Sequence, residues 1–248
     1  MSHTKWIRAA VLLAAFLAIS SASAAEPSPN LIEPPSLRQM LQRGEGFALI
    51  NVMSRLECMD HSIAGSLCVA DEEFPGKALK LFPDKNRPLV FYDESNHDTG
   101  SQKAAAIAVQ KGYKRVSVLR GGITAWKEAG FETVSQMRIP RVPVESIKPE
   151  RLAQWLFEKR DLLILDIRGE APFREDHLPG AINIPLHRLH ERYPEIPWNR
   201  RILVVDERGL RSFLACSYLV RKDIGDVKRL FGGMERWQAY LAAKQGNR

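Results

Sequence analysis

The sequence predicts an α/β fold that occurs twice in the chain, each copy with a mainly parallel central sheet flanked by helices. Short apolar runs bounded by turn residues alternate with helix-like patterns, which is typical of strands covered on both faces. The segment LRGGITAW at 119–126 recurs as LFGGMERW at 230–237, and similar segments precede both in the same order. This self-similarity indicates a duplicated domain.

The N-terminal segment has the three-part order of a secretory signal peptide. Lys5 and Arg8 precede an apolar run at 9–19, and small residues follow as far as Ala25. We therefore expect residues 1–25 to be removed, with cleavage after Ala24 or Ala25, and the mature protein to be periplasmic or secreted. The apolar run is much shorter than the roughly 20 residues that span a bilayer, so we expect no membrane anchor after cleavage.

The composition excludes several classes of protein. With 45% hydrophobic and 26% charged residues, the chain is neither disordered nor collagen-like. The formal net charge of +7 falls by two when Lys5 and Arg8 are removed. The remaining basic residues are mixed with acidic ones, as at 158–161, so we expect a mixed surface and no nucleic-acid binding.

The repeat divides the mature chain into two domains, at 31–134 and 146–246. The connection at 135–145 contains Pro140 and Pro143, which disfavour helix and suit a short, semi-rigid linker.

Each copy has three clear strand patterns and a clear helix pattern. The predicted strands are 48–52, 88–92 and 116–119 in the first copy and 162–165, 202–205 and 227–230 in the second; the predicted helices are 101–111 and 211–222, with another beginning at Pro149. In parallel sheets, ligands bind at the carboxyl ends of strands. The segments that follow Asp93 and Asp206 are therefore the first places to look for chemistry.

The ordered motifs of the second copy resemble those of the rhodanese-like domains, a family of sulfurtransferases. They are LDIRGE (165–170), EDHLPGAINIP (175–185), VVDERGLRS (204–212) and LFGGMERW (230–237), and the first copy matches them as INVMSR, DHSIAGSLCV, VFYDESNHDTGS and LRGGITAWKEAG. The resemblance implies a tandem pair of rhodanese-like domains. It also implies a strand that ends in a nucleophilic cysteine, followed by a loop of pattern C-x-x-G-x-R whose N–H groups stabilise a thiolate and a persulfide.

Neither copy has cysteine at the position that the resemblance assigns to the nucleophile. Asp206 stands there in the second copy and Asp93 in the first, whose loop is about two residues longer and has no arginine. A carboxylate oxygen cannot form and release an S–S bond, but it can accept the inward N–H bonds. We therefore expect no catalytic residue in either loop, and each aspartate to fill its own anion site. The candidate anion loop of the second copy consists of Glu207, Arg208, Gly209, Leu210, Arg211 and Ser212.

The three cysteines lie away from those two positions. Cys58 and Cys68 are ten residues apart and suit a local disulfide, although two buried thiols or a redox-active pair also fit. Cys216 aligns with Ala105 of the first copy, which favours a packing role in the helix after the second loop.

Other polar residues have structural interpretations beside functional ones. By the resemblance, Asp166, Arg168 and Glu170 form an ion network near the second loop. Arg208 and Arg211 make the rim of that loop electropositive and able to bind a small oxyanion, or Arg211 pairs with Asp206 or Glu207.

The histidines and tryptophans favour structural roles. His61 and His177 match each other and suit capping hydrogen bonds. His187 and His190, with Glu191, give weak support for a metal site, and we expect no metal and no cofactor. The equivalent residues Trp126 and Trp237 are expected in the cores.

These observations favour a non-catalytic tandem rhodanese-like module, a pseudoenzyme that binds or regulates in the periplasm. The expected ligand is a small, sulfur-containing oxyanion or a partner protein from sulfur or redox metabolism. The alternative is a thiosulfate or persulfide sulfurtransferase, or a thiol-redox enzyme, that uses Cys58, Cys68 or Cys216. A phosphatase is the weakest hypothesis, because it too needs a cysteine at position 206.

Overall fold

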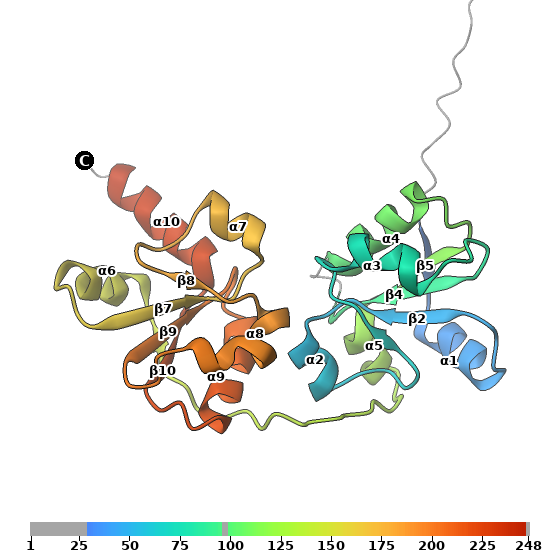
Figure 1. Cartoon of the computed structure of the whole chain (residues 1–248), viewed down its shortest axis with the longest axis horizontal. Helices are drawn as coiled ribbons and strands as arrows, with labels where there is room; N and C mark the ends of the chain where they lie inside the picture. The colour runs from blue at the N-terminus through green and yellow to red at the C-terminus, as the bar shows by residue number, and fades with distance from the viewer. Residues whose placement is uncertain (1–28, 96–98, 247–248) are drawn as a thin grey trace, which may run out of the picture.

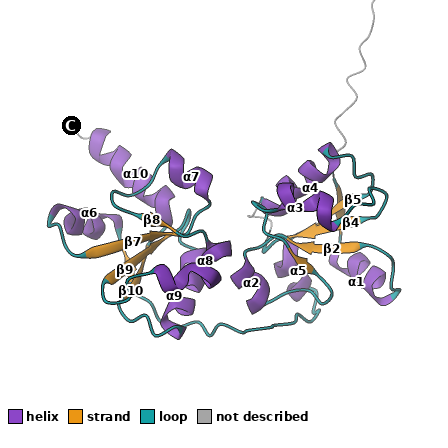
Figure 2. Cartoon of the chain, in the orientation of Figure 1, coloured by secondary structure: helices purple, strands orange, loops and turns teal. Residues whose placement is uncertain are grey.

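The chain folds into two α/β domains that lie side by side (Figure 1). The computed structural model describes residues 29–95 and 99–246. Each domain contains a five-stranded sheet in which all paired strands are parallel. Figure 2 shows helices on both faces of each sheet. The predicted fold class is thereby confirmed, whereas the predicted signal segment lies outside the described residues.

Domain 1 has the strand order β1-β5-β4-β2-β3. Its elements are β1 (Asn30–Ile32), α1 (Pro34–Gln42), β2 (Ala48–Asn51), α2 (Arg55–Asp60), β3 (Leu67–Cys68), α3 (Phe74–Leu81), β4 (Leu89–Tyr92), α4 (Gly100–Gln110), β5 (Val116–Leu119) and α5 (Gly122–Glu128).

Domain 2 repeats this order as β6-β10-β9-β7-β8. Its elements are β6 (Ser146–Ile147), α6 (Pro149–Phe157), β7 (Leu162–Asp166), α7 (Glu170–Glu175), β8 (Ile182–Asn183), α8 (Leu186–Arg192), the 3-10 turn η1 (Tyr193–Glu195), β9 (Arg201–Val205), α9 (Arg211–Arg221), β10 (Val227–Leu230) and α10 (Gly233–Gly246).

The central strands send alternate side chains to two separate cores. In β9, Ile202 and Val204 join the core under α8 and α9, whereas Leu203 and Val205 join the core under α6 and α10. All four side chains are fully buried, and each burial stabilises the fold by about 1.5–3 kcal/mol. This explains why the strand reads as a continuous apolar run rather than an alternating one.

The six predicted strands and the two bounded helices form within a residue or two of their predicted limits. The edge strands β1 and β6 were not predicted. They have only three and two residues, and they gain their structure by pairing with β5 and β10. Among the described residues, no helix is both long and apolar enough to cross a membrane.

The helix α2 of domain 1 packs against domain 2. Leu56 and Met59 belong to the core cluster that contains Leu186, Leu189 and Leu214. Leu56 is fully buried there. The equivalent helix α7 of domain 2 has no buried residue. The two copies of the domain are therefore joined through an asymmetric contact that only the first copy provides.

The predicted linker is held on both sides. The carbonyl oxygen of Met59 accepts hydrogen bonds from the backbone N–H groups of Gln136 and Met137. Ile139 is buried in the core cluster of domain 2, and its N–H donates to Asp60 Oδ1 at 2.7 Å. The linker is thus packed against both domains.

Candidate functional site

The second loop closes around the carboxylate of Asp206. This residue follows β9 directly and is 4% exposed. Its Oδ1 accepts the N–H of Gly209 at 2.8 Å, and its Oδ2 accepts the N–H groups of Arg211 at 2.7 Å and Ser212 at 3.0 Å. The last two donors open α9, where unpaired N–H groups and the helix dipole favour negative charge. The carboxylate of Asp206 therefore occupies the anion position of its own loop.

The Gly-Gly turn of the repeated motif, at 232–233, packs directly against the backbone of this loop. Gly233 has a φ of +60°, and a Cβ built on it would lie 2.4 Å from the carbonyl oxygen of Asp206. The turn also donates backbone hydrogen bonds, from Met234 to the Asp206 carbonyl and from Glu235 to the Glu207 carbonyl. The backbone of the loop and that of the turn are in direct contact, which only glycine allows.

The first loop follows the same plan. Asp93 is 3% exposed, and its Oδ2 accepts the N–H of Ser101 in the first turn of α4 at 2.9 Å. A Cβ on Gly122 would lie 2.4 Å from the Asp93 carbonyl, as in the second copy. Residues 96–98 of this loop lie outside the described residues.

Arg168 forms ion pairs both with the second loop and with Asp166, the last residue of the neighbouring strand β7. Its side chain is 6% exposed, and it pairs with Asp166 at 2.8 Å and with Glu207 at 3.2 Å. It also donates to the Asp176 carbonyl oxygen at 2.6 Å. The expected ion network therefore exists, but Glu207 completes it where we expected Glu170. Glu170 opens α7, and its exposed side chain lies 4.0 Å from Arg174, one helical turn along.

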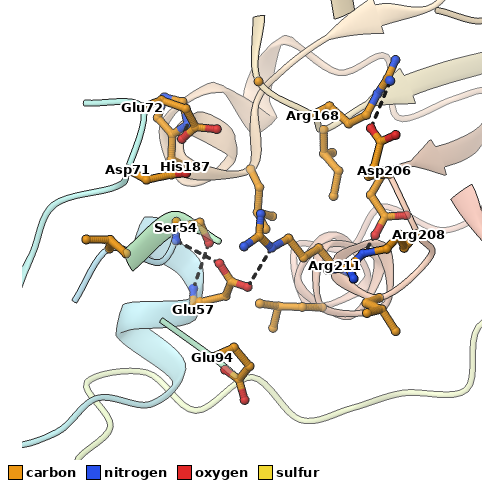
Figure 3. Close-up of a pocket in the computed structure, with 18 of the residues that line it drawn as sticks. Ser54, Glu57, Asp71, Glu72, Glu94, Arg168, His187, Asp206, Arg208 and Arg211 are labelled. Atoms are coloured by element: carbon orange, nitrogen blue, oxygen red, sulfur yellow. Dashed lines mark hydrogen bonds and ion pairs between the residues drawn. The ribbon is translucent and has the colours of Figure 1, made fainter. Parts of the chain in front are cut away.

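Both loops face a cleft of about 740 Å³ between the domains (Figure 3). The cleft is lined by residues that follow the carboxyl ends of strands in both sheets, such as Ser54, Asp71 and Gly169. Charged side chains of both signs contribute: Lys103, Arg141, Arg168, Arg208, Arg211, Glu57, Asp71, Glu72, Glu94, Asp206, Glu207 and Glu235. Leu210 at the tip of the second loop is 67% exposed. The cleft thus presents a mixed-charge lining with an apolar tip.

The guanidinium of Arg211 extends across the cleft to domain 1. Its Nε lies 3.4 Å from Glu57 Oε1, and a dashed line in Figure 3 marks this ion pair. The other oxygen of Glu57 accepts the N–H of Ser54 at 2.9 Å, and Ser54 Oγ accepts the N–H of Glu57 at 3.3 Å. This reciprocal capping box fixes the first turn of α2 and orients the carboxylate. Sequence reasoning considered Asp206 and Glu207 as partners of Arg211 and missed Glu57.

A second polar contact joins the walls of the cleft. His187 Nδ1 of domain 2 lies 3.3 Å from Glu72 Oε2 of domain 1, and this hydrogen bond lowers the pKa of Glu72 despite its burial. Burial, together with the neighbouring charge of Glu72, raises the pKa of Asp71 to about 6. No pattern in the sequence predicts the contact between His187 and Glu72, because the two residues lie in different domains.

His61 links α2 to the first loop. Its Nδ1 lies 3.1 Å from Asp60 Oδ2 and its Nε2 lies 2.6 Å from Glu94 Oε2. Burial disfavours the charged ring, but the hydrogen bonds with these two carboxylates outweigh it and raise the pKa of His61 to about 9. Burial also opposes ionisation of Asp60, yet the bonds from His61 and the Ile139 N–H lower its pKa to about 2. At neutral pH, His61 is therefore a partly buried cation between two carboxylates.

This pKa gives the stability of domain 1 a specific dependence on pH. Because the pKa is higher in the folded state than the ordinary 6.5, the stabilisation is complete below pH 6.5 and is lost as the pH rises through about 9. We expect the free energy of unfolding to fall by up to about 3 kcal/mol between about pH 6 and about pH 9.5. Urea unfolding at the two pH values measures this difference. His61→Gln should show a much smaller fall; equal falls in the two proteins would show that another group is responsible.

The domain topology and the loop geometry agree with a comparison against protein-family models. The model of the rhodanese-like domain matches residues 33–129 and 148–240, which together make up well over half of the chain. The chain belongs to the rhodanese-like family. Its two rhodanese-like domains correspond to the two halves of the sequence repeat.

Curated relatives of these domains include sulfurtransferases. A protein named sulfurtransferase from Allochromatium vinosum is 36% identical over 94 residues, covering 38% of this chain and 88% of the relative. The thiosulfate sulfurtransferase GlpE of Coxiella burnetii is 29% identical over 98 residues, covering 39% of this chain and 92% of the relative. Each relative is therefore similar to a single rhodanese-like domain in length.

Among solved structures, a thiosulfate sulfurtransferase from Pseudomonas aeruginosa is 20% identical with a TM-score of 0.41, covering 82% of this chain and 43% of that one. The 3-mercaptopyruvate sulfotransferase SseA from Escherichia coli is 18% identical with a TM-score of 0.37, covering 83% of this chain and 99% of that one.

The structure places all three cysteines of the rhodanese-like pair away from the loops' anion positions. Cys58 in α2 and Cys68 in β3 form a disulfide, with Cα atoms 6.1 Å apart. Cys216 in α9 is fully buried, and its burial raises the pKa of the thiol to about 12. Thiolates are the nucleophilic form of cysteine, so this site opposes a reactive Cys216.

The remaining candidate residues have separate, local partners. His177 Nδ1 lies 2.8 Å from the Phe173 carbonyl oxygen, a hydrogen bond at the end of α7. His190 Nδ1 lies 3.0 Å from the Tyr218 hydroxyl, away from the Glu72 contact of His187. Trp126 and Trp237 are buried, as predicted. Over 29–95 and 99–246, no three histidine, cysteine or acidic side chains converge to hold a metal ion.

Proposed function

We propose that the protein is an exported, non-catalytic rhodanese-like module that binds a partner protein or a small sulfur-containing anion in the cleft between its domains. The observation that carries this proposal is the triple hydrogen bond of Asp206 to the N–H groups of Gly209, Arg211 and Ser212. In a sulfurtransferase loop those donors would stabilise a persulfide. Here they hold a side chain that cannot accept sulfur.

The charge of the occupied loop favours a partner protein over a small anion. An incoming anion would have to displace the carboxylate of Asp206 or bind beside it, at a cost in charge repulsion. The lining of the cleft carries both positive and negative side chains and the exposed apolar side chain of Leu210. A peptide segment with one apolar side chain and mixed charges matches this lining better than a free oxyanion does, because apolar anchors supply much of the binding energy at interfaces.

The second candidate function is sulfur transfer by a cysteine outside the loop. The names of the curated relatives favour it. Against it stand the burial of Cys216, with its pKa raised to about 12, and the disulfide between the other two cysteines. Such an enzyme would need an opening of α9 to use Cys216, or a reductant to use Cys58 or Cys68.

A sulfur-transfer assay separates the two functions. In the assay, a thiolate takes the outer sulfur of thiosulfate, sulfite leaves, and cyanide removes the bound sulfur as thiocyanate. We expect no thiocyanate above the uncatalysed background, with or without prior reduction of the protein by a dithiol. Turnover that disappears in Cys216→Ala, while that variant keeps its circular dichroism spectrum, would overturn the proposal in favour of the second candidate.

A further inference from the structure

The helix α2 contributes side chains to the cores of both domains. Its side chains Leu56 and Met59 pack into the core of domain 2, whereas Cys58 packs into the core of domain 1 beside Leu49 and Tyr92. Cys58 is bonded to Cys68 at the end of β3, which is one of the two edge strands of the first sheet. The disulfide therefore joins domain 1 covalently to a helix whose other apolar side chains are held by domain 2.

The second copy supplies an internal comparison. When the motifs are aligned, Arg174 and Asn183 stand where Cys58 and Cys68 stand in the first copy. That copy has no disulfide, and its helix α7 has no buried residue. The disulfide occurs in the copy whose helix packs against the other domain, where five of the six residues of α2 are buried.

The helix α2 also makes polar contacts with residues that line the cleft and with the linker. Glu57 pairs with Arg211 of the second loop. Asp60 accepts the N–H of Ile139 and pairs with Arg141 at 3.0 Å, and Arg141 lines the cleft. Any movement of α2 relative to domain 1 would therefore change the position of both the linker and the second loop relative to the first loop.

We propose that the Cys58–Cys68 disulfide is a reversible redox latch for the pairing of the two domains. In the oxidised protein it fixes α2 to domain 1 and so fixes the two walls of the cleft. In the reduced protein domain 1 moves relative to α2 and domain 2, and the cleft opens. This inference goes beyond the proposed binding function and holds whether or not the protein transfers sulfur.

The reductant is a dithiol, and the step is thiol–disulfide exchange. One thiolate of the dithiol attacks Sγ of Cys68, which is partly exposed, and Cys58 leaves as a thiolate that takes up a proton. The second thiol of the reductant then resolves the mixed disulfide, so that Cys68 is released as a thiol and the dithiol becomes a disulfide. Both Sγ atoms lie within 3.8 Å of the Met53 carbonyl oxygen, so each reduced thiol has an acceptor in place.

Hydrogen exchange of the linker amides tests the latch. The N–H groups of Gln136, Met137 and Ile139 are bonded to α2, whereas the linker begins directly after Val134 of domain 1. A movement of domain 1 relative to α2 therefore pulls the linker away from the helix, and the exchange of these amides reports it. We expect titration of the native protein with dithiothreitol to reduce the disulfide without denaturant, and the linker amides then to exchange about tenfold faster or more. The amides of β9 should exchange at an unchanged rate, and reoxidation should restore the slow linker exchange.

Two controls keep the inference falsifiable. Cys216→Ser should respond to the dithiol as the wild type does, because Cys216 is not part of the latch. The Cys58→Ser/Cys68→Ser variant should show fast linker exchange in the absence of any reductant; if it fails to fold, the reduced wild type serves in its place. A disulfide that is reduced only in denaturant, or linker amides that exchange equally slowly in both redox states, would overturn the proposal.

Discussion

Replacing Asp206 by cysteine is expected to create a protein that carries a persulfide after exposure to thiosulfate. The change removes the carboxylate from the three N–H donors of Gly209, Arg211 and Ser212 and leaves a thiol there. These donors, with the N-terminus of α9, favour the thiolate and then the persulfide anion. We expect a mass increase of one sulfur atom and a thiocyanate rate at least about tenfold above the wild type.

The chain offers a matched control in its first copy. Asp93→Cys places a thiol at the equivalent position, after β4, in a loop that is longer and has no arginine at the closing position. We expect at most a small gain from this variant. If Asp206→Cys folds but acquires no sulfur, then the N–H groups of the second loop do not stabilise a persulfide. In that case Asp206 is not the reason why the wild-type loop cannot accept sulfur.

The Gly233→Ala variant is expected to lose about 3–5 kcal/mol of stability in domain 2. Its φ of +60° strains any residue with a Cβ, and the added atom would lie about 2.5 Å from backbone atoms of Asp206 and Glu207. Backbone atoms cannot swing aside as a long side chain can, so the loop or the turn must shift. Urea unfolding followed by tryptophan fluorescence measures the loss.

Gly225→Ala is the matched control for this variant. Gly225 has no positive φ, and a Cβ built on it meets no atom within 4 Å. We expect its stability to change by less than about 1 kcal/mol. A Gly233→Ala protein as stable as this control would show that the Gly-Gly turn does not support the second loop.

The sequence predicted the fold well because the decisive signals are local. Continuous apolar runs such as 202–205 require a sheet covered on both faces, and the repeat requires the same fold twice. The positions of Asp93 and Asp206 also followed from the sequence, since each residue comes directly after a predicted strand.

The contacts between the domains could not be predicted in the same way. The partner of Arg211 is Glu57, and no spacing along the chain relates residues in separate domains. One signal was present but unused: α2 carries Leu56 and Met59 three residues apart on one face, whereas α7 has no equivalent pair. That difference indicates that the helix of the first copy, and not that of the second, packs against the other domain.

The most direct test of the central claim is the mass of the intact wild-type protein after incubation with thiosulfate, before and after reduction with a dithiol. The occupied loop and the buried Cys216 predict an unchanged mass in both samples once the two hydrogens added by reduction are counted. An additional sulfur atom that cyanide removes would contradict the claim, and peptide mapping would then identify the cysteine that carries it.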